Sequence, residues 1–281
     1  MRAWVRHWPI ALGALALLVP TMRAVASQSW STEQGAHGPI VLATAFWLIW
    51  REEAQIRAVA RPGAPALAAA LLVPALALYI VARITGILEV EGPAMYLSLL
   101  VVLYACIGSA AMRVMWFPLV YLLFVFPPPD TLVAAITQPL KIELSRAAVG
   151  LLSAFGLPIS RAGVIIQVAQ YDVLVAAACA GLNSIISLSA IGLFYIYVRH
   201  NANWRYALFL AIVIVPVAIF SNFLRVLMLI LLTYYLGDAA AQGFLHEFAG
   251  MFMFVVALSC IIGIDALARP ICDRLAQESR T

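Results

Sequence analysis

The sequence predicts an all-α polytopic membrane protein with about eight transmembrane helices, an extracytoplasmic amphipathic helix and a short β-hairpin. Of the 281 residues, 65% are hydrophobic and only 11% are charged, whereas a soluble domain is about 45–50% apolar and about 25% charged. The apolar residues also form runs close to the roughly 20 residues that a helix needs to cross the bilayer core. This composition excludes an independent soluble domain, so we expect one integral membrane domain over residues 1–281.

Eight apolar runs are the candidate transmembrane segments. Residues 93–127 could alternatively form one bent span, which would reverse the orientation of the N-terminal half. The basic start of the chain resembles that of a signal peptide, but no small-residue cleavage site follows, so we interpret the first run as a span. The six longer runs are 9–26, 65–83, 93–112, 180–198, 206–225 and 246–267, and the two shorter ones are 38–50 and 114–127.

The placement of Lys and Arg predicts the orientation of these spans. With the N-terminus inside, eleven basic residues fall on the inner face and six on the outer face, which agrees with the positive-inside rule. We therefore expect both termini to be cytoplasmic. The net charge of +4 lies in the short loops between apolar runs. Because no polar face carries a basic stripe, nucleic acid is not an expected partner.

Two further segments do not have the pattern of a span. Residues 128–156 place charged residues such as Lys141 and Glu143 among Leu, Ile and Val, which is typical of an amphipathic helix on the membrane surface. Residues 163–176 are rich in β-branched residues with a polar break, so we expect a short extracytoplasmic hairpin there. We expect the catalytic half of the chain at about 128–267.

Three reactive side chains are expected at the outer ends of three different spans. Cys179 precedes the span 180–198, Arg225 ends the span 206–225, and His246 begins the last span. The span that ends at Arg225 has the length of one bilayer core, about 30 Å. Each residue alone has a simpler explanation, as a small packing residue, an interfacial anchor or a helix-start residue. Their coincidence at one depth favours a functional site.

The chemistry of this set is that of a cysteine nucleophile. A helix N-terminus and a nearby cation lower the pKa of a thiol such as Cys179, and Gly181 leaves its sulfur uncrowded. His246 can take the thiol proton and return it to a leaving amine. Arg225 stays protonated and can hold a developing oxyanion. Asn222, one turn before it, can orient the guanidinium or bind substrate backbone.

The sequence indicates no metal and no cofactor. The remaining cysteines are Cys106, Cys260 and Cys272, and no pair has CxxC spacing. The other histidines fall on separate loops. A metal centre needs several such ligands close together, so we expect none.

Three short motifs resemble those of the exosortases and archaeosortases, a family of polytopic membrane cysteine transpeptidases or proteases. The motifs are Ala178-Cys-Ala-Gly-Leu182, Asn222-Phe-Leu-Arg-Val226 and His246-Glu-Phe-Ala-Gly250, and their order and spacing fit the family pattern. Many family members carry Ser directly after the Cys and Arg two places after the Gly, where this chain has Ala180 and Asn183. Asn183 keeps hydrogen-bonding capacity but not the charge, so the recognised signal can differ.

The resemblance implies the substrate and the reaction. The expected partners are secreted proteins with a C-terminal sorting tail of the PEP-CTERM kind: a Pro-containing motif, a transmembrane helix and a basic end. The enzyme would cleave this tail on the periplasmic face through a thioester at Cys179. A lipid or glycan acceptor, or water, would then resolve the thioester.

Two other functions compete with this interpretation. A polytopic transporter or channel is one, although the midplanes of the predicted spans are nearly free of charge and no repeat is visible, unlike many transporters. A non-catalytic scaffold for exopolysaccharide export is the other. It predicts that Cys179, Arg225 and His246 can each be replaced without effect.

Overall fold

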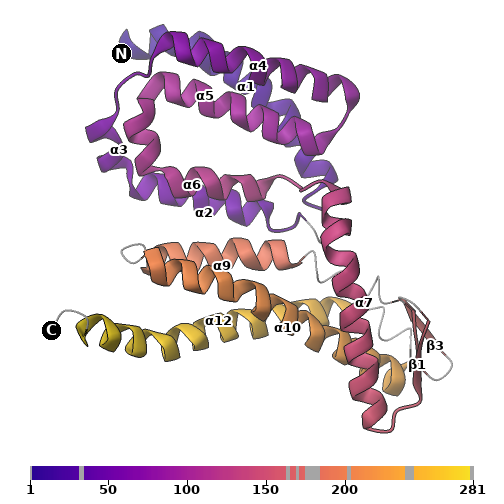
Figure 1. The fold of residues 1–281 in the computed structure, drawn as a ribbon. Helices are drawn as coiled ribbons and strands as arrows, with labels where there is room; N and C mark the ends of the chain where they lie inside the picture. The colour runs from indigo at the N-terminus through magenta and orange to yellow at the C-terminus, as the bar shows by residue number, and fades with distance from the viewer. Residues whose placement is uncertain are drawn as a thin grey trace. The chain divides into compact units, whose positions relative to one another are not determined.

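The computed structural model describes residues 2–31, 35–162, 165–168, 171–174, 184–200, 204–237 and 244–278 (Figure 1). The elements are α1 (Arg2–Gln28), α2 (Gly38–Arg51), α3 (Glu53–Val59), α4 (Pro65–Thr85), α5 (Leu88–Val114), α6 (Trp116–Tyr121), the 3₁₀ helix η1 (Leu122–Val125), α7 (Asp130–Ala154), β1 (Ile159–Ala162), β2 (Ile165–Val168), β3 (Tyr171–Leu174), α9 (Ser184–His200), α10 (Trp204–Leu236) and α12 (Phe244–Glu278).

The chain divides into two compact units, Met1–Pro129 and Asp130–Thr281. The division follows three consecutive prolines, residues 127–129, which cannot continue a regular hydrogen-bonded helix. The predicted catalytic half at about 128–267 begins at this division. The expectation of one domain over the whole chain stays a prediction.

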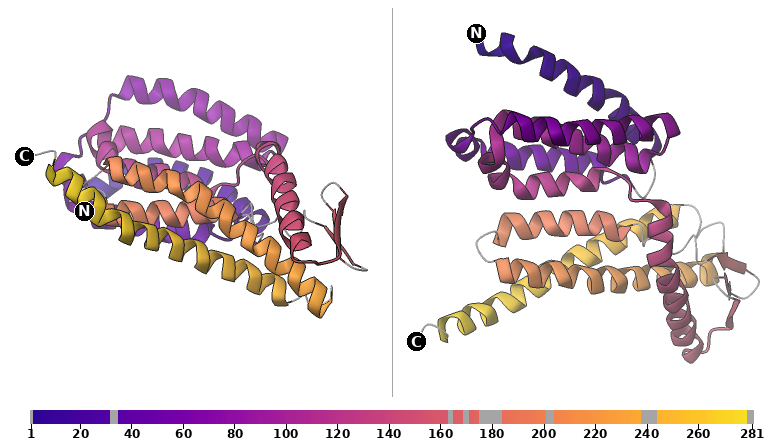
Figure 2. Two further views of the ribbon diagram at one scale, coloured as in Figure 1. Left: turned by 60° about the horizontal axis from the view of Figure 1, so that its bottom comes forward. Right: turned by 45° about the horizontal axis from the view of Figure 1, so that its top comes forward.

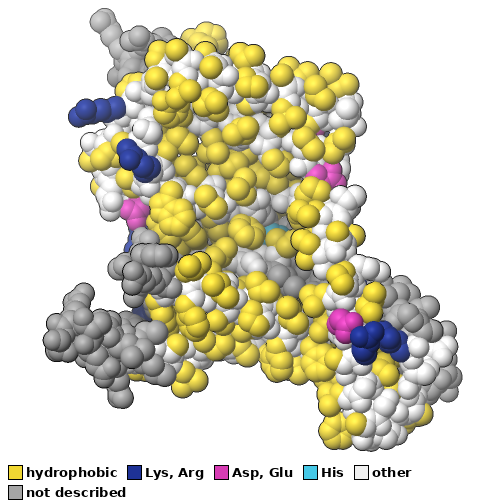
Figure 3. All heavy atoms as spheres, in the orientation of Figure 1, with side chains coloured by type: hydrophobic (Ala, Val, Ile, Leu, Met, Phe, Trp, Pro, Cys, Tyr) yellow, Lys and Arg dark blue, Asp and Glu magenta, His cyan; other side chains and the backbone are white. Residues whose placement is uncertain are grey.

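The prediction of a helical polytopic membrane protein is confirmed, but the count of eight crossings stays a prediction. Every predicted run overlaps a helix of the described residues, and five helices are long and apolar enough to cross a membrane. The described parts of the other three are shorter than the roughly 20 residues that a crossing needs. Hydrophobic side chains cover most of the face shown in Figure 3, as lipid contact requires. The five long segments are Trp8–Gln28, Pro65–Thr85, Leu88–Val114, Tyr206–Leu236 and Gly250–Ala268, and the shorter ones are Gly38–Arg51, Trp116–Val125 and Ile186–Arg199.

In the first unit, a buried carboxylate joins helices α1, α4 and α5. Glu91, in the first turn of α5, is 3% exposed. Its Oε1 accepts hydrogen bonds from Arg83 Nη1 at 2.7 Å and from Thr21 Oγ1 at 2.8 Å. A buried carboxylate is tolerated when it is paired and hydrogen-bonded in this way. Its three members come from three different helices, so sequence patterns alone do not predict the cluster.

The chain reverses direction between α5 and η1, so the alternative of one bent span over 93–127 is wrong. The Tyr96 hydroxyl donates a hydrogen bond to the Leu119 carbonyl at 2.5 Å, and the Tyr96 and Phe126 rings lie 5.7 Å apart. A Cβ added at Gly92 would lie 2.6 Å from the Phe126 ring. The start of α5 therefore lies beside the end of η1, and the two runs are separate antiparallel segments.

Gly108 breaks the hydrogen-bond ladder of α5. Its φ of 74° and ψ of 177° lie far from helical values, and such a φ favours glycine. The loop after α3 satisfies the carbonyls near the break, because the amides of Arg61 and Gly63 donate to the carbonyls of Ile107 and Ala105. An apolar environment requires such replacement partners, since water is not there to supply them.

In the second unit, α9, α10 and α12 form a helical bundle with one shared core. At one end of the bundle, Asp265 of α12 is 4% exposed. Its carboxylate accepts hydrogen bonds from the hydroxyls of Tyr195 in α9 at 2.6 Å and Tyr206 in α10 at 2.8 Å. These bonds tie the three helices together and leave the carboxylate satisfied.

Helix α7 and the sheet cover one face of the second half of α10. Both views in Figure 2 show α7 crossing α10 steeply. Ala148 and Leu152 of α7 pack with Ile166 of β2 and with Val226 and Ile230 of α10. The predicted amphipathic pattern is present: these residues are buried, whereas the ion pair between residues 143 and 146 is exposed.

The sheet has three antiparallel strands in the order β1-β2-β3. The predicted hairpin at 163–176 corresponds to β2 and β3, in which Ile165 pairs with Leu174 and Val168 pairs with Tyr171. Strand β1 extends the sheet beyond the prediction, with Ile159 paired to Val168.

Candidate functional site

Arg225 lies inside α10, and the expectation that the helix ends there is wrong. The helix continues for eleven residues to Leu236, about 16 Å at 1.5 Å per residue. Residues 226–236 are almost entirely apolar, so nothing in them ends a helix. The helix ends at Gly237, where φ is 84° and the amide bonds the Thr233 carbonyl, as at many helix C-termini.

The Arg225 side chain is buried, with 2% of its surface exposed. It is therefore not an interfacial anchor that extends to water. A guanidinium keeps its proton even when buried, and removing a charge from water costs several kcal/mol unless polar groups surround it. Such a residue in an apolar helix indicates a functional site.

The Arg225 guanidinium lies directly against α12 at Gly250. A Cβ added at Gly250 would lie 3.7 Å from Arg225 Nη2 and 3.9 Å from Cζ. The absence of a side chain at Gly250 leaves room for the guanidinium beside the α12 backbone. This contact places the Arg225 side chain of α10 beside the first turns of α12.

His246 lies in the first turn of α12, four residues before Gly250. Positions four apart in a helix lie on the same face, separated by about 6 Å along the axis. The position of His246 on the helix is therefore one turn from the Gly250 backbone that contacts Arg225. Its side chain lies outside the described part of the structure.

The other predicted site residues, Cys179, Gly181 and Asn183, lie outside the described residues. Helix α9 is described from Ser184, five residues after Cys179. The predicted span begins at residue 180, and the helix is described from residue 184 onward. The placement of the thiol at a helix N-terminus stays a prediction.

The start of α9 nevertheless lies at the level of the Arg225 region. A Cβ added at Gly192 of α9 would lie 2.8 Å from Ile214 of α10 and 3.5 Å from Ile261 of α12, so the three helices meet at that level. Helices α9 and α10 are joined by a short connection and lie side by side in Figures 1 and 2. Ser184 and Asn222 each lie eight residues from this contact, about 12 Å in the same direction.

Asn222 and Ser221 are buried polar residues without satisfied side chains. Both are 0% exposed. Among the described residues, neither the Asn222 amide nitrogen and oxygen nor the Ser221 hydroxyl has a hydrogen-bond partner. Leaving such groups unpaired costs about 1–3 kcal/mol each, so these atoms are suited to bind a polar group from outside the described residues. Asn222 was predicted from the sequence and Ser221 was not, although the two form a polar pair within an apolar run.

The described residues contain no group of three or more His, Cys, Asp or Glu side chains that could hold a metal ion. Cys106 and Cys260 are free thiols in α5 and α12. Neither is a sequence neighbour of Arg225 or Gly250. The expectation that the protein needs no metal or cofactor stays a prediction.

Comparison with protein families identifies the chain. A family model described as transmembrane exosortase matches residues 30–263. The chain belongs to the exosortase family. The match includes all three motifs around Cys179, Arg225 and His246. No curated protein and no solved structure matched the chain in the corresponding searches.

Proposed function

We propose that this exosortase is a membrane-embedded cysteine peptidase and transpeptidase that removes a C-terminal sorting tail from secreted proteins. The observation that carries the proposal is the buried Arg225 against Gly250, one helical turn from His246. The family match supports it, because it covers this region and Cys179 together. A buried cation with an imidazole and a thiol close to it would be suited to acyl transfer.

The proposed reaction proceeds through a thioester. His246 takes the proton of the Cys179 thiol, and the thiolate attacks the scissile carbonyl carbon, giving a tetrahedral oxyanion. The intermediate collapses, the C–N bond breaks, and the leaving amine takes the proton from His246. A nucleophile on a lipid or glycan acceptor, or water, then attacks the thioester and releases Cys179.

Arg225 stabilises the oxyanion in this proposal. It carries a fixed positive charge in a buried site, where a charge–charge interaction is stronger than in water. The unpaired amide of Asn222 and the hydroxyl of Ser221 are suited to bind the peptide groups next to the scissile bond. Gly181 and Asn183 are proposed to support the nucleophile and the recognition of the tail.

We further propose eight membrane crossings, with both termini in the cytoplasm and the site at the periplasmic face of the inner membrane. The distribution of basic residues supports this orientation. The steep crossing of α7 over α10 (Figure 2) and its amphipathic pattern support a helix that lies on the membrane surface.

The test is the intact mass of a co-expressed secreted protein with a C-terminal sorting tail. Wild-type enzyme should shorten the substrate, Cys179→Ala should not, and added mass on the product would identify the acceptor. Cys260→Ala is the matched control, because it removes a thiol from the same bundle outside the proposed site and should process normally. Equal processing by wild type and Cys179→Ala would contradict the proposal.

A further inference from the structure

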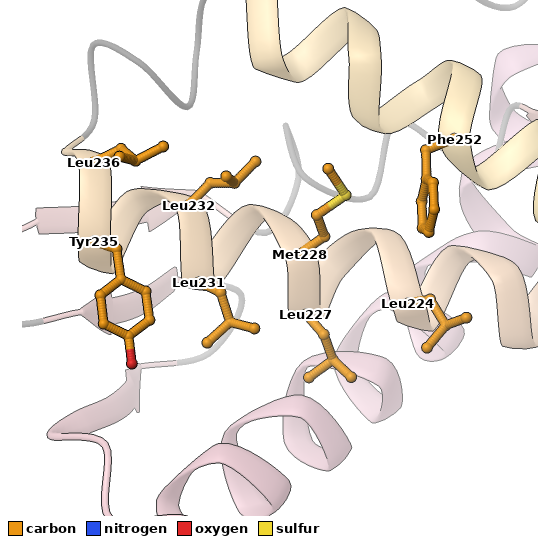
Figure 4. Close-up of a pocket in the computed structure, with 8 residues that line it drawn as sticks. All are labelled: Leu224, Leu227, Met228, Leu231, Leu232, Tyr235, Leu236 and Phe252. Carbon is orange, nitrogen blue, oxygen red and sulfur yellow. The ribbon is translucent and has the colours of Figure 1, made fainter.

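An apolar groove runs along α10 beyond Arg225 (Figure 4). Its volume is about 590 Å³. Seven lining side chains come from the last turns of α10 and one comes from α12. They are Leu224, Leu227, Met228, Leu231, Leu232, Tyr235, Leu236 and Phe252.

The walls of the groove do not suit an extended peptide. Apart from the Tyr235 hydroxyl, the lining side chains carry no hydrogen-bonding group of ordinary strength. An extended peptide would leave its backbone N–H and C=O groups unpaired against these walls, which is costly. The occupant must therefore be apolar along its length or satisfy its polar groups internally.

The groove is too small to enclose a helix. From Leu224 to Leu236 the groove is about 18 Å long. A helix of that length and about 10 Å in diameter has an envelope of about 1,400 Å³, larger than the groove, so a helix could enter it only in part. A single flexible hydrocarbon chain is thinner than a helix and has no polar groups to satisfy.

The groove is continuous with the lipid-facing surface of α10. Phe209 and Phe220 are 44% and 51% exposed. Phe220 lies eleven residues after Phe209 and seven before Leu227, and these spacings keep all three on one helical face. A hydrocarbon chain could therefore pass from the lipid along this face into the groove without crossing a polar surface.

The groove begins beside the contact between Arg225 and Gly250. Gly250 contacts Arg225, the neighbour of Leu224 in sequence. From this level the groove follows α10 toward Leu236. Its far end is open, since Tyr235 is 71% exposed and Leu236 is 59% exposed.

We propose that this groove binds one hydrocarbon chain of a membrane lipid from the adjacent leaflet. The groove holds the chain against α10 along residues 224–236. This binding site does not depend on the proposed peptidase activity. The Cys179→Ala variant is therefore expected to bind lipid as the wild type does, so failure of one proposal is distinguishable from failure of the other.

The test uses the full chain reconstituted in vesicles of phosphatidylethanolamine and phosphatidylglycerol, with a trace of a phospholipid that has a photoreactive chain end. After detergent exchange, native mass spectrometry should find about one retained phospholipid per chain. Crosslinks should map to residues 224–236 and to Phe252. Met228→Trp and Leu232→Trp, which fill the groove, should each lower retention at least tenfold.

Ile212→Trp is the matched control, because Ile212 lies on the same helix, is 63% exposed and does not line the groove. It should retain lipid as the wild type does. Leu232→Ala enlarges the groove and should also keep the lipid, which separates filling from misfolding. Equal retention in the folded groove-filling variants, no retention in the wild type, or crosslinks spread evenly along α10 would overturn the proposal. Displacement of all lipid by an apolar helical peptide would overturn it in favour of a protein partner.

Discussion

Replacement of Arg225 by Lys tests the role of its guanidinium most directly. The change keeps a positive charge in a site that is 2% exposed. Groups that interact with this charge therefore still face a cation. The change removes the planar fork that can hold an oxyanion with two hydrogen bonds. Loss of one oxyanion donor typically lowers kcat by about 10²–10³, equivalent to about 2.7–4 kcal/mol in the barrier.

We therefore expect Arg225→Lys to reduce cleavage of a co-expressed tailed substrate by about 10²-fold or more. The unfolding free energy should fall by no more than about 3 kcal/mol, the upper value for hydrogen bonds to a charged group. The rate is measured by intact mass over time and normalised to folded enzyme, which is quantified by size-exclusion chromatography in detergent. Arg225→Met should abolish cleavage.

Arg146→Lys is the control for this experiment. Arg146 pairs with Glu143 at 2.8 Å, and its side chain is 61% exposed, so replacement should change stability by less than about 0.5 kcal/mol and leave cleavage intact. If Arg225→Lys and Arg225→Met both cleave within threefold of wild type, Arg225 does not stabilise the oxyanion. If lost cleavage only follows lost folded protein, its role is structural.

Three further predictions concern other parts of the chain. Gly250→Ala should keep activity, because its Cβ would meet Arg225 at ordinary contact distance, whereas Gly250→Leu should reduce cleavage at least tenfold. Gly263→Leu is the control, because Gly263 has open space around it. Equal cleavage by both Leu variants would show that activity does not need the space at Gly250. Glu91→Gln should lower the unfolding free energy by about 1–3 kcal/mol without changing cleavage by folded enzyme, and an unchanged Tm would contradict the buried cluster. Burial lowers the pKa of His37 below its ordinary value of 6.5, so the unfolded chain binds the proton first and stability falls as the pH drops below about 6.5. His37→Gln should flatten this part of the Tm–pH curve, and an unchanged curve would exclude His37 as its cause.

The sequence predicted the helical elements well, because each depends on a local property. Runs of apolar residues predicted eight helices, and charged residues placed among apolar ones predicted α7. The ends were less predictable. The predicted span ended at Arg225, because a charged residue lies there at one bilayer length from the start of the run. In the structure the apolar residues after Arg225 continue the helix to Leu236, and the positive φ of Gly237 ends it.

The side-chain clusters were beyond the reach of sequence patterns. Glu91 was not singled out, because its partners Thr21 and Arg83 come from other helices. Asp265 was missed for the same reason, since its two tyrosine donors depend on the register of three helices. Arg225 and His246 were identified individually. Gly250 appeared only as part of a motif, because its space-making role follows from the distance to a side chain on α10.

The contact between Gly250 and Arg225 sets a limit on sequence variation in related chains. A bulky residue at position 250 would displace the guanidinium, so only small residues are compatible with an arginine at position 225. Chains that have lost this arginine are free of the restriction and can carry larger residues there. The two positions should therefore covary, and a large residue at position 250 would mark relatives that have given up the arginine-dependent chemistry.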